Sequence, residues 1–274
     1  MKNITIQGAV IPALGLGTFQ LPDAVAQEIT AAALSEGYRH IDTAQIYQNE
    51  AGVGTAIKNA SIDREKIFLT TKVFRENLHK KDFLPSVEES LRKLKTDHVD
   101  LLLIHWPNRN VPVAEYMEQL MEAQHKGYTK YIGVSNHTTA LLDQVLATGA
   151  DIITNQVEYH PLINQNKLHT YLREKGISLT AYSPIAQGKV LGNPTLKAIG
   201  EKYGKSEVQV SLRWLVQQNN VMAIPRTSKA ERLRDNINLF DFELTADEVK
   251  AIDQLKQDNI RVVNPSFAPD WDTV

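Results

Sequence analysis

The sequence has no cysteine, little net charge and no long hydrophobic run. Without cysteine the protein has no disulfides, no thiolate nucleophile and no cysteine-ligated zinc. A formal charge of −2 over 274 residues gives no reason to expect a nucleic acid or a membrane surface as partner. We therefore expect neither a nucleic acid nor a membrane as partner.

No segment approaches the ~18 apolar residues that a membrane-spanning helix needs. Residues 1–8 contain no apolar segment of the kind found in signal peptides. We therefore expect the protein to act in the cytoplasm. Its length of 274 residues suits one large barrel or two modest domains, and a hydrophobic content of 42% is ordinary for a globular protein.

Short apolar segments alternate with segments of helical spacing along most of the chain. Such alternation predicts a parallel sheet, and eight units of this kind close as a barrel. We therefore predict an α/β fold, a single (β/α)8 TIM barrel over residues 1–274, with a short N-terminal β-hairpin around Gly8 and a C-terminal tail (258–274) over the active-site mouth. The predicted strands are 14–17, 39–41, 67–71, 99–104, 131–134, 153–157, 177–181 and 221–224. The predicted helices include 24–36, one that begins at Asn49 and Glu50, 82–95, 112–126, 138–148 and 165–175, and two more that begin at the capping boxes Ser206/Gln209 and Thr245/Glu248.

One short motif points to a different fold. Gly15 and Gly17 have the spacing that opens a dinucleotide-binding fingerprint, but position 20 is glutamine, so the third glycine is missing. The doubly wound fold is therefore disfavoured.

Polar side chains gather at the ends of the predicted strands. In a barrel the carboxyl ends of the strands share one face, and active sites lie on that face. This clustering indicates an enzyme. The residues are Asp42, Lys72, His105, Ser135, Asn136, Gln156, Tyr182 and Arg226.

The pairing of Asp42 with Lys72 has two interpretations. A lysine at the end of an apolar strand is unfavourable unless it is paired, so the two residues could form a purely structural ion pair. Tyr47 suggests chemistry instead, because an ammonium group beside a phenol lowers its pKa from about 10 and equips it to protonate a developing alkoxide. His105 could then hydrogen-bond the carbonyl oxygen. Nothing among these residues supplies a reductant, so a cofactor is required.

Other strand-end residues could hold such a cofactor. The amides of Asn136 and Gln156 could bind a carboxamide, and Tyr182 could stack on a flat ring. A polar cluster after the last predicted strand favours a phosphorylated ligand, although a solvated charge cluster is the alternative. The cluster contains Arg226, Thr227, Ser228, Arg232 and Asn236.

These motifs, taken together, resemble the aldo-keto reductase family, and the resemblance runs in order from about residue 4 to the end of the chain. The segments that carry it are Gly15-Leu-Gly-Thr-Phe19, Arg39-His-Ile-Asp-Thr-Ala-x-x-Tyr47-x-Asn-Glu50, Thr70-Thr-Lys72, His105-Trp-Pro107, Gly133-Val-Ser-Asn136, Asn155-Gln156 and Ala181-Tyr-Ser-Pro184. The compact length and the ending, residues 261–272, resemble the bacterial 2,5-diketo-D-gluconate reductases of the B type and methylglyoxal reductases of this family.

The resemblance implies hydride transfer from NADPH to an aldehyde or ketone, such as methylglyoxal or 2,5-diketo-D-gluconate, by a monomeric enzyme without a metal. The implied catalytic residues are Tyr47 as proton donor, Lys72 with Asp42 to tune it, and His105 to orient the carbonyl. The implied cofactor contacts are Gly17, Thr18, Asp42, Ser135, Asn136, Gln156, Tyr182, Ser183, Pro184, Ala186, Arg226, Thr227, Ser228, Arg232, Asp235 and Asn236. The implied substrate contacts are Phe19, Tyr47, Phe74, His105, Trp106, Phe267 and Trp271.

Four positions depart from the pattern of the family. Phe19 and Phe74 stand where many relatives carry tryptophan, which implies a differently shaped pocket. Arg226 replaces a lysine and Asp235 a glutamate, so the charges survive and a preference for NADPH is still expected.

Three other functions fit parts of the pattern. The family fold also serves as an NADPH-binding regulatory subunit without physiological turnover. A barrel aldolase could use Lys72 for a Schiff base, and a metal-dependent hydrolase could use His40, Asp42 and His105. Because neighbouring residues on a strand face opposite sides, we expect His40 to point away from Asp42.

Overall fold

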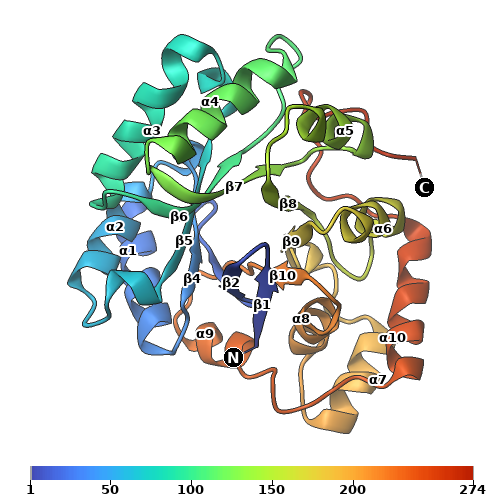
Figure 1. Cartoon of the computed structure of the whole chain (residues 1–274). Coiled ribbons are helices and arrows are strands. Elements are labelled where there is room, and N and C mark those ends of the chain that lie inside the picture. Colours follow the sequence, from blue (N-terminus) through green and yellow to red (C-terminus); the bar gives the residue numbers. More distant parts are fainter. Residues whose placement is uncertain (1, 274) are drawn as a thin grey trace.

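The computed structural model describes residues 2–273. Its main feature is a sheet of eight parallel strands in which each strand pairs with the next one along the chain (Figure 1). The predicted eight strands are thus confirmed. They are β3 (Leu16–Gly17), β4 (His40–Asp42), β5 (Phe68–Val73), β6 (Val99–Ile104), β7 (Thr129–Ser135), β8 (Ile152–Glu158), β9 (Ser178–Tyr182) and β10 (Val221–Ala223).

The first and last strands meet, so the sheet closes into a barrel. The amide of Gly15 donates to the carbonyl of Ala223 at 2.9 Å, and the amide of Gly17 donates to that of Pro225 at 3.0 Å. A side chain at position 17 would place its Cβ 2.8 Å from the carbonyl oxygen of Ile224. Only glycine therefore permits this close approach of the two strands.

Helices surround the barrel in Figure 1 and explain why the strands read as continuous apolar runs. Every residue of β5, β6 and β8 is buried, as expected for parallel strands covered on both faces. The helices are α1 (Asp23–Ser35), α2 (Glu50–Asn59), α3 (Lys80–Leu94), α4 (Val113–His125), α5 (Thr139–Ala147), α6 (Asn166–Glu174), α7 (Pro194–Tyr203), α8 (Glu207–Gln217), α9 (Glu231–Ile237) and α10 (Ala246–Asp253).

The helix boundaries depend on local capping signals. Both predicted capping boxes are present, at the start of α8 and of α10. Two helices, α7 and α9, were not predicted from the sequence. For α7 the signals exist, since the side chain of Asn193 accepts from two backbone amides, Pro194 occupies the first turn and Gly204 ends the helix. The short α9 has no side-chain cap.

The N-terminal hairpin covers the amino-terminal end of the barrel. It pairs β1 (Asn3–Ile6) with β2 (Ala9–Pro12) through a two-residue turn in which Gln7 and Gly8 both have positive φ. The side chain of Gln7 donates to the carbonyls of Ile152 and Gly176, next to where β8 and β9 begin. The predicted site therefore lies at the opposite end.

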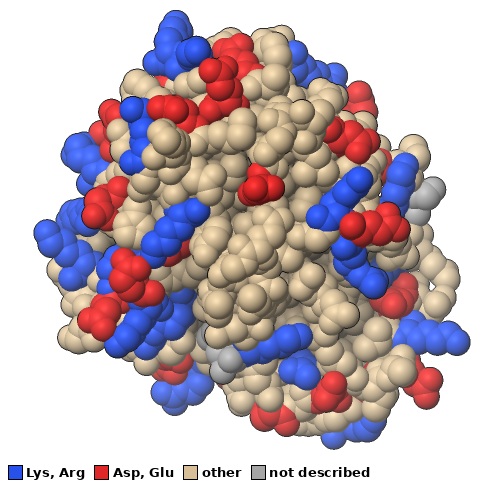
Figure 2. Space-filling view, in the orientation of Figure 1, with Lys and Arg blue, Asp and Glu red and all other residues tan. Residues whose placement is uncertain are grey.

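Figure 2 shows the face that carries the hairpin, where acidic and basic side chains are interspersed and neither sign forms a large patch. In the part of the chain that the structure describes, no helix is both long enough and apolar enough to cross a membrane.

The C-terminal tail, residues 259–273, has no helix or strand and runs beside α5 and α6 (Figure 1). It contacts the loops that follow four successive strands of the barrel. Its partners there are Arg75 after β5, Trp106 and Arg109 after β6, Thr139 after β7, and Glu158 at the end of β8. The tail therefore covers part of the predicted active-site mouth, as expected.

Candidate active site

A buried ion pair joins the ends of β4 and β5. Lys72 forms a salt bridge with Asp42, and both side chains are almost completely inaccessible to solvent. The ammonium group of Lys72 also donates to the carbonyl of Thr43 at 2.8 Å and to the phenol oxygen of Tyr47 at 3.4 Å. The three residues that sequence reasoning grouped therefore form one hydrogen-bonded cluster.

The loop after β4 holds Tyr47 beside two other rings. Its ring lies 5.1 Å from Phe19 and 5.5 Å from His105, measured between ring centroids. A neighbouring residue that the sequence analysis missed, Gln45, fixes this loop. Its side chain accepts from the amide of Phe74 and donates to Ser86, which ties the Tyr47 turn to the loop after β5 and to α3.

The expected direction of the Tyr47 pKa is wrong. Burial raises the pKa of the phenol well above 10, and the carboxylate of Asp42 raises it further. Lys72 does not offset the effect of burial, because its positive charge is neutralised by Asp42 at contact distance. Tyr47 is therefore a protonated phenol at neutral pH.

His105 is neutral in the same pocket. Burial, followed by the charge of Lys72, lowers the pKa of its imidazole well below 6.5. Nδ1 of the ring is buried and has no hydrogen-bond partner among residues 2–273. A buried polar atom without a partner is unusual in a folded protein.

Amide side chains extend the cluster across β7 and β8. Gln156 donates from its amide to the second carboxylate oxygen of Asp42 at 2.7 Å, and among the described residues no donor is bonded to its carbonyl oxygen. Asn136 donates to the carbonyl of His105 and accepts from the hydroxyl of Tyr182 at 2.8 Å. Ser135 donates to the backbone of Gln156. These residues therefore lie together, as predicted.

A buried network behind this cluster was not predicted. Asn136 has a positive φ of 61°, and the next residue, His137, holds it in place. The ring of His137 lies 2.9 Å from the carbonyl of Ser135 and 2.9 Å from the hydroxyl of Tyr116, while its own carbonyl accepts from Asn155. Burial lowers the pKa of His137 to about 4, so it is neutral at pH 7.

The predicted phosphate-binding segment lies after β10 and is mostly exposed. Arg226 donates to the carbonyls of Phe19 and Gln20, which joins this segment to the loop after β3. The predicted residues Ser228, Arg232 and Asp235 are exposed, whereas Thr227 and Asn236 are buried.

The remaining predicted cofactor residues lie in two other loops at this end. Gly17 ends β3, and the hydroxyl of Thr18 donates to the carbonyl of Asp42 at 3.1 Å. Ser183, Pro184 and Ala186 follow β9, where Ser183 and Ala186 both have positive φ. Both loops begin where a barrel strand ends, so they lie near the cluster of Asp42, Lys72 and Tyr47.

Three of the predicted substrate residues pack their rings together and are called the aromatic wall below: Trp106, Phe267 and Trp271. Trp106 packs against Phe267 at 5.4 Å and against Trp271 at 6.1 Å, so two rings of the C-terminal tail flank it. Phe74 lies 6.4 Å from His105.

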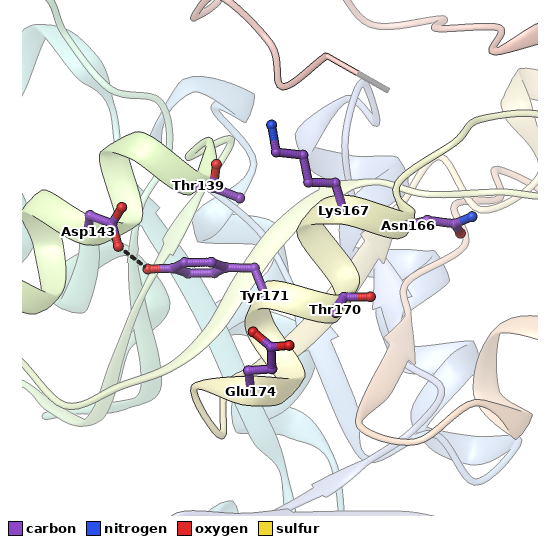
Figure 3. A pocket seen from close by; sticks show the side chains of 7 residues that line it. All are labelled: Thr139, Asp143, Asn166, Lys167, Thr170, Tyr171 and Glu174. Atoms are coloured by element: carbon purple, nitrogen blue, oxygen red, sulfur yellow. Dashed lines mark hydrogen bonds between the residues drawn. The ribbon is translucent and has the colours of Figure 1, made fainter.

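A hollow of about 530 Å³ lies elsewhere, on the outer surface between α5 and α6 (Figure 3). Tyr171 and Asp143 in it are hydrogen-bonded to each other, as the dashed line shows, and Thr139 is bonded to Asp272 of the tail. It contains none of the predicted site residues. The hollow is lined by Thr139, Asp143, Asn166, Lys167, Thr170, Tyr171 and Glu174.

The geometry also bears on the alternative chemistries. His40 lies 3.2 Å from the carbonyl of Pro12 through its Nδ1 and packs edge-on against Phe68. Within residues 2–273 no group of three metal-ligating side chains is positioned to hold an ion. Lys72 is bonded to Asp42 and Thr43, whereas a Schiff-base lysine needs a free amine.

Known proteins resemble this chain over nearly its whole length. A family model described as "Aldo/keto reductase family" matches residues 13–257. Methylglyoxal reductase DkgB of Yersinia pestis is 44% identical over 267 residues, which is 96% of this chain and 99% of the relative. Glyoxal reductase of Bacillus subtilis is 40% identical over 261 residues, 94% of each.

The fold is also found among solved structures. A crystal structure of a proposed 2,5-diketo-D-gluconic acid reductase B matches with a TM-score of 0.97 and 48% identity, and the match covers all of this chain and 98% of the other.

Proposed function

The chain belongs to the aldo/keto reductase family, and we propose that it reduces small aldehydes and ketones to alcohols with NADPH. The favoured substrates are 2-oxoaldehydes such as methylglyoxal, or 2,5-diketo-D-gluconate, because relatives at 44% and 48% identity carry these names. We further propose that the chain is one barrel domain and acts as a monomer.

The observation that carries this proposal is the contact of a buried ion pair with a phenol beside an unpartnered imidazole. Tyr47 is protonated at neutral pH, so it can donate a proton to an oxygen that gains negative charge. An alkoxide is a stronger base than a phenolate, so the high pKa of Tyr47 still permits the transfer. The N–H of Lys72, 3.4 Å from the phenol oxygen, stabilises the charge that the oxygen then carries.

His105 orients the substrate in this mechanism. A neutral imidazole can donate a hydrogen bond to the carbonyl oxygen without competing with Tyr47 for the proton. Nε2 of His105, which is not among the buried ring atoms, is the nitrogen that this oxygen can reach.

The residues present also fit a nicotinamide cofactor. Gln156 has a free carbonyl oxygen for a carboxamide N–H, and Tyr182, whose hydroxyl is tied to Asn136, offers a ring to stack on. Arg232 is exposed and available for a phosphate. When bound, NADPH supplies the hydride that the carbonyl carbon accepts.

Charge near the aromatic wall bears on the choice of substrate. The guanidinium of Arg75 lies over Phe267 at 4.5 Å and that of Arg261 over Trp271 at 3.9 Å. Each has one buried nitrogen without a hydrogen-bond partner in the described chain. Arg75 is paired with Glu76 at 3.5 Å, whereas no carboxylate lies within 4.0 Å of Arg261 among the described residues. The charge of Arg261 therefore favours an anionic substrate such as 2,5-diketo-D-gluconate over neutral methylglyoxal.

The test is NADPH oxidation followed by absorbance with methylglyoxal, 2,5-diketo-D-gluconate and 4-nitrobenzaldehyde, with NADH in parallel. We expect turnover with NADPH on at least one of them. Cofactor binding without turnover would instead support a regulatory subunit. Covalent trapping by borohydride with a substrate, in the absence of NADPH binding, would support an aldolase that uses Lys72.

A further inference from the structure

A carboxylate outside the catalytic cluster has an unusual environment. Glu158, the last residue of β8, is completely buried, and among the described residues no lysine or arginine nitrogen lies within 4.0 Å of it. The guanidinium of Arg261 in the tail, whose pKa is lowered by burial, is close enough for Glu158 to raise that pKa, but it does not contact the carboxylate. A buried carboxylate without a contacting cation needs several hydrogen-bond donors. The donors to Glu158 therefore identify the segment of the chain that this residue holds in place.

Three N–H groups donate to the carboxylate of Glu158, and two of them belong to the C-terminal tail. The backbone amides of Val262 and Val263 donate to the two carboxylate oxygens, at 2.6 and 2.8 Å. The third donor is Nε2 of His160, at 2.9 Å. Nδ1 of His160 accepts from the amide of Leu162, so the hydrogen between His160 and Glu158 lies on Nε2. The carboxylate thus binds the first residues of the tail directly.

The segment that begins there is a compact loop, residues 261–271. Arg261 stacks on Trp271 at 3.9 Å, and the indole N–H of Trp271 donates to Asn264 at 2.9 Å, so the two ends of the loop meet. Within the loop, Phe267 and Trp271 flank Trp106. The position of the loop therefore sets the position of the aromatic wall.

Glu158 also belongs to the strands that carry the proposed cofactor residues. It follows Gln156 by two residues, and it pairs with Tyr182 in the register of β8 and β9. One side chain thus connects the loop that lines the substrate pocket to the strand ends beside it.

We propose that Glu158 is a positioning residue for substrate recognition, which places residues 261–271 by binding the amides of Val262 and Val263. The inference rests on the proposed reductase function. It predicts that losing this contact weakens binding of substrates large enough to reach the aromatic wall. Proton donation by Tyr47, which touches neither Glu158 nor the tail in the described structure, should be spared.

The first variant is Glu158→Gln, which keeps the size of the side chain. A carboxylate can accept all three N–H groups, whereas the amide has one acceptor oxygen and turns an NH2 group toward a donor. The second variant, Val263→Pro, removes the amide N–H that Val263 donates to Glu158, so it weakens the same contact by a change in the tail. Glu174→Gln, at an exposed position of α6, is the matched control.

The kinetic readout separates KM from kcat. In Glu158→Gln we expect KM for 4-nitrobenzaldehyde to rise about tenfold, with kcat and the Kd of NADPH changed less than about threefold, and a smaller rise for methylglyoxal. Val263→Pro should behave alike, and the double variant should be no worse than the poorer single one. An unchanged KM, a loss confined to kcat, weaker NADPH binding or additive losses would each overturn the proposal.

A second readout does not depend on turnover. Trypsin cleavage after Arg261 releases residues 262–274, and mass spectrometry of the product measures how often the tail leaves its place. We expect cleavage about tenfold faster in Glu158→Gln than in wild type or Glu174→Gln. Faster cleavage in a protein without reductase activity would reject the proposed function and retain the tail contact, whereas unchanged cleavage would reject the contact itself.

Discussion

Two regions at the carboxyl end of the barrel differ in how their charges are held. Asp42 and Lys72 are buried and bonded to each other and to neighbouring protein groups. The segment after β10, with Arg226 and Arg232, is exposed to solvent. Buried groups act through fixed geometry, and exposed charges act through a field that salt screens. We therefore expect the first region to determine the chemistry and the second to determine which cofactor is preferred.

The largest expected effect is in the buried region. Tyr47→Phe removes the proposed proton donor, and general acid catalysis typically contributes 10²- to 10⁴-fold, so we expect kcat to fall by about that factor. The fold should survive because Lys72 keeps its bonds to Asp42 and Thr43. NADPH titration by fluorescence should give a Kd close to that of wild type. A variant that retains normal turnover would refute the role of Tyr47.

Removing one member of the ion pair should affect stability as well as activity. Lys72→Met leaves Asp42 buried without its countercharge, which typically costs about 3–5 kcal/mol of unfolding free energy. The double variant Lys72→Met/Asp42→Asn has no buried charge there, so we expect most of that stability to return in urea denaturation while reduction stays impaired. If the double variant recovered its activity, the pair would be structural only, as the alternative interpretation of the sequence held.

The buried region should also be sensitive to acid. His137 has its pKa lowered to about 4, so between pH 6.5 and 4 the unfolded chain binds a proton that the folded protein does not. Stability therefore falls as the pH falls through this window, by about 3 kcal/mol from His137 alone. The free-energy gap between wild type and His137→Asn should narrow by that amount between pH 7 and 4. A constant gap would contradict the assignment.

Much of the barrel was predictable because its strands are buried on both faces. Val99–Ile104 was predicted to the residue, since an apolar run that ends at His105-Trp106-Pro107 has few other interpretations. The short helix α9 was missed because it has no side-chain cap and only seven residues. Local sequence signals thus account for both the success and the failure.

The candidate site also has features that the sequence predicts and features that it does not. Asp42, Lys72 and Tyr47 could be grouped because each stands at or just after the end of a predicted strand, and the ends of barrel strands converge. The direction of the Tyr47 pKa could not be predicted, because it depends first on how deeply the phenol is buried and then on its distance from Asp42. The bonds from Val262 and Val263 to Glu158 join residues more than 100 positions apart through backbone amides, which leave no trace in the side-chain pattern.

The smallest expected effect is in the exposed region. Arg232→Ala should weaken NADPH about tenfold and NADH less than twofold, because only NADPH carries the 2′-phosphate that we assign to this side chain. Arg234→Ala is the matched control on the same helix, since Arg234 is also exposed but pairs with Glu36, the residue after α1. The preference for NADPH in wild type should shrink as salt rises, whereas the effect of Tyr47→Phe should not change. If NADPH and NADH lost affinity equally, or if salt did not change the preference for NADPH, Arg232 would not bind the 2′-phosphate. The proposed difference between the buried and the exposed region would then be wrong.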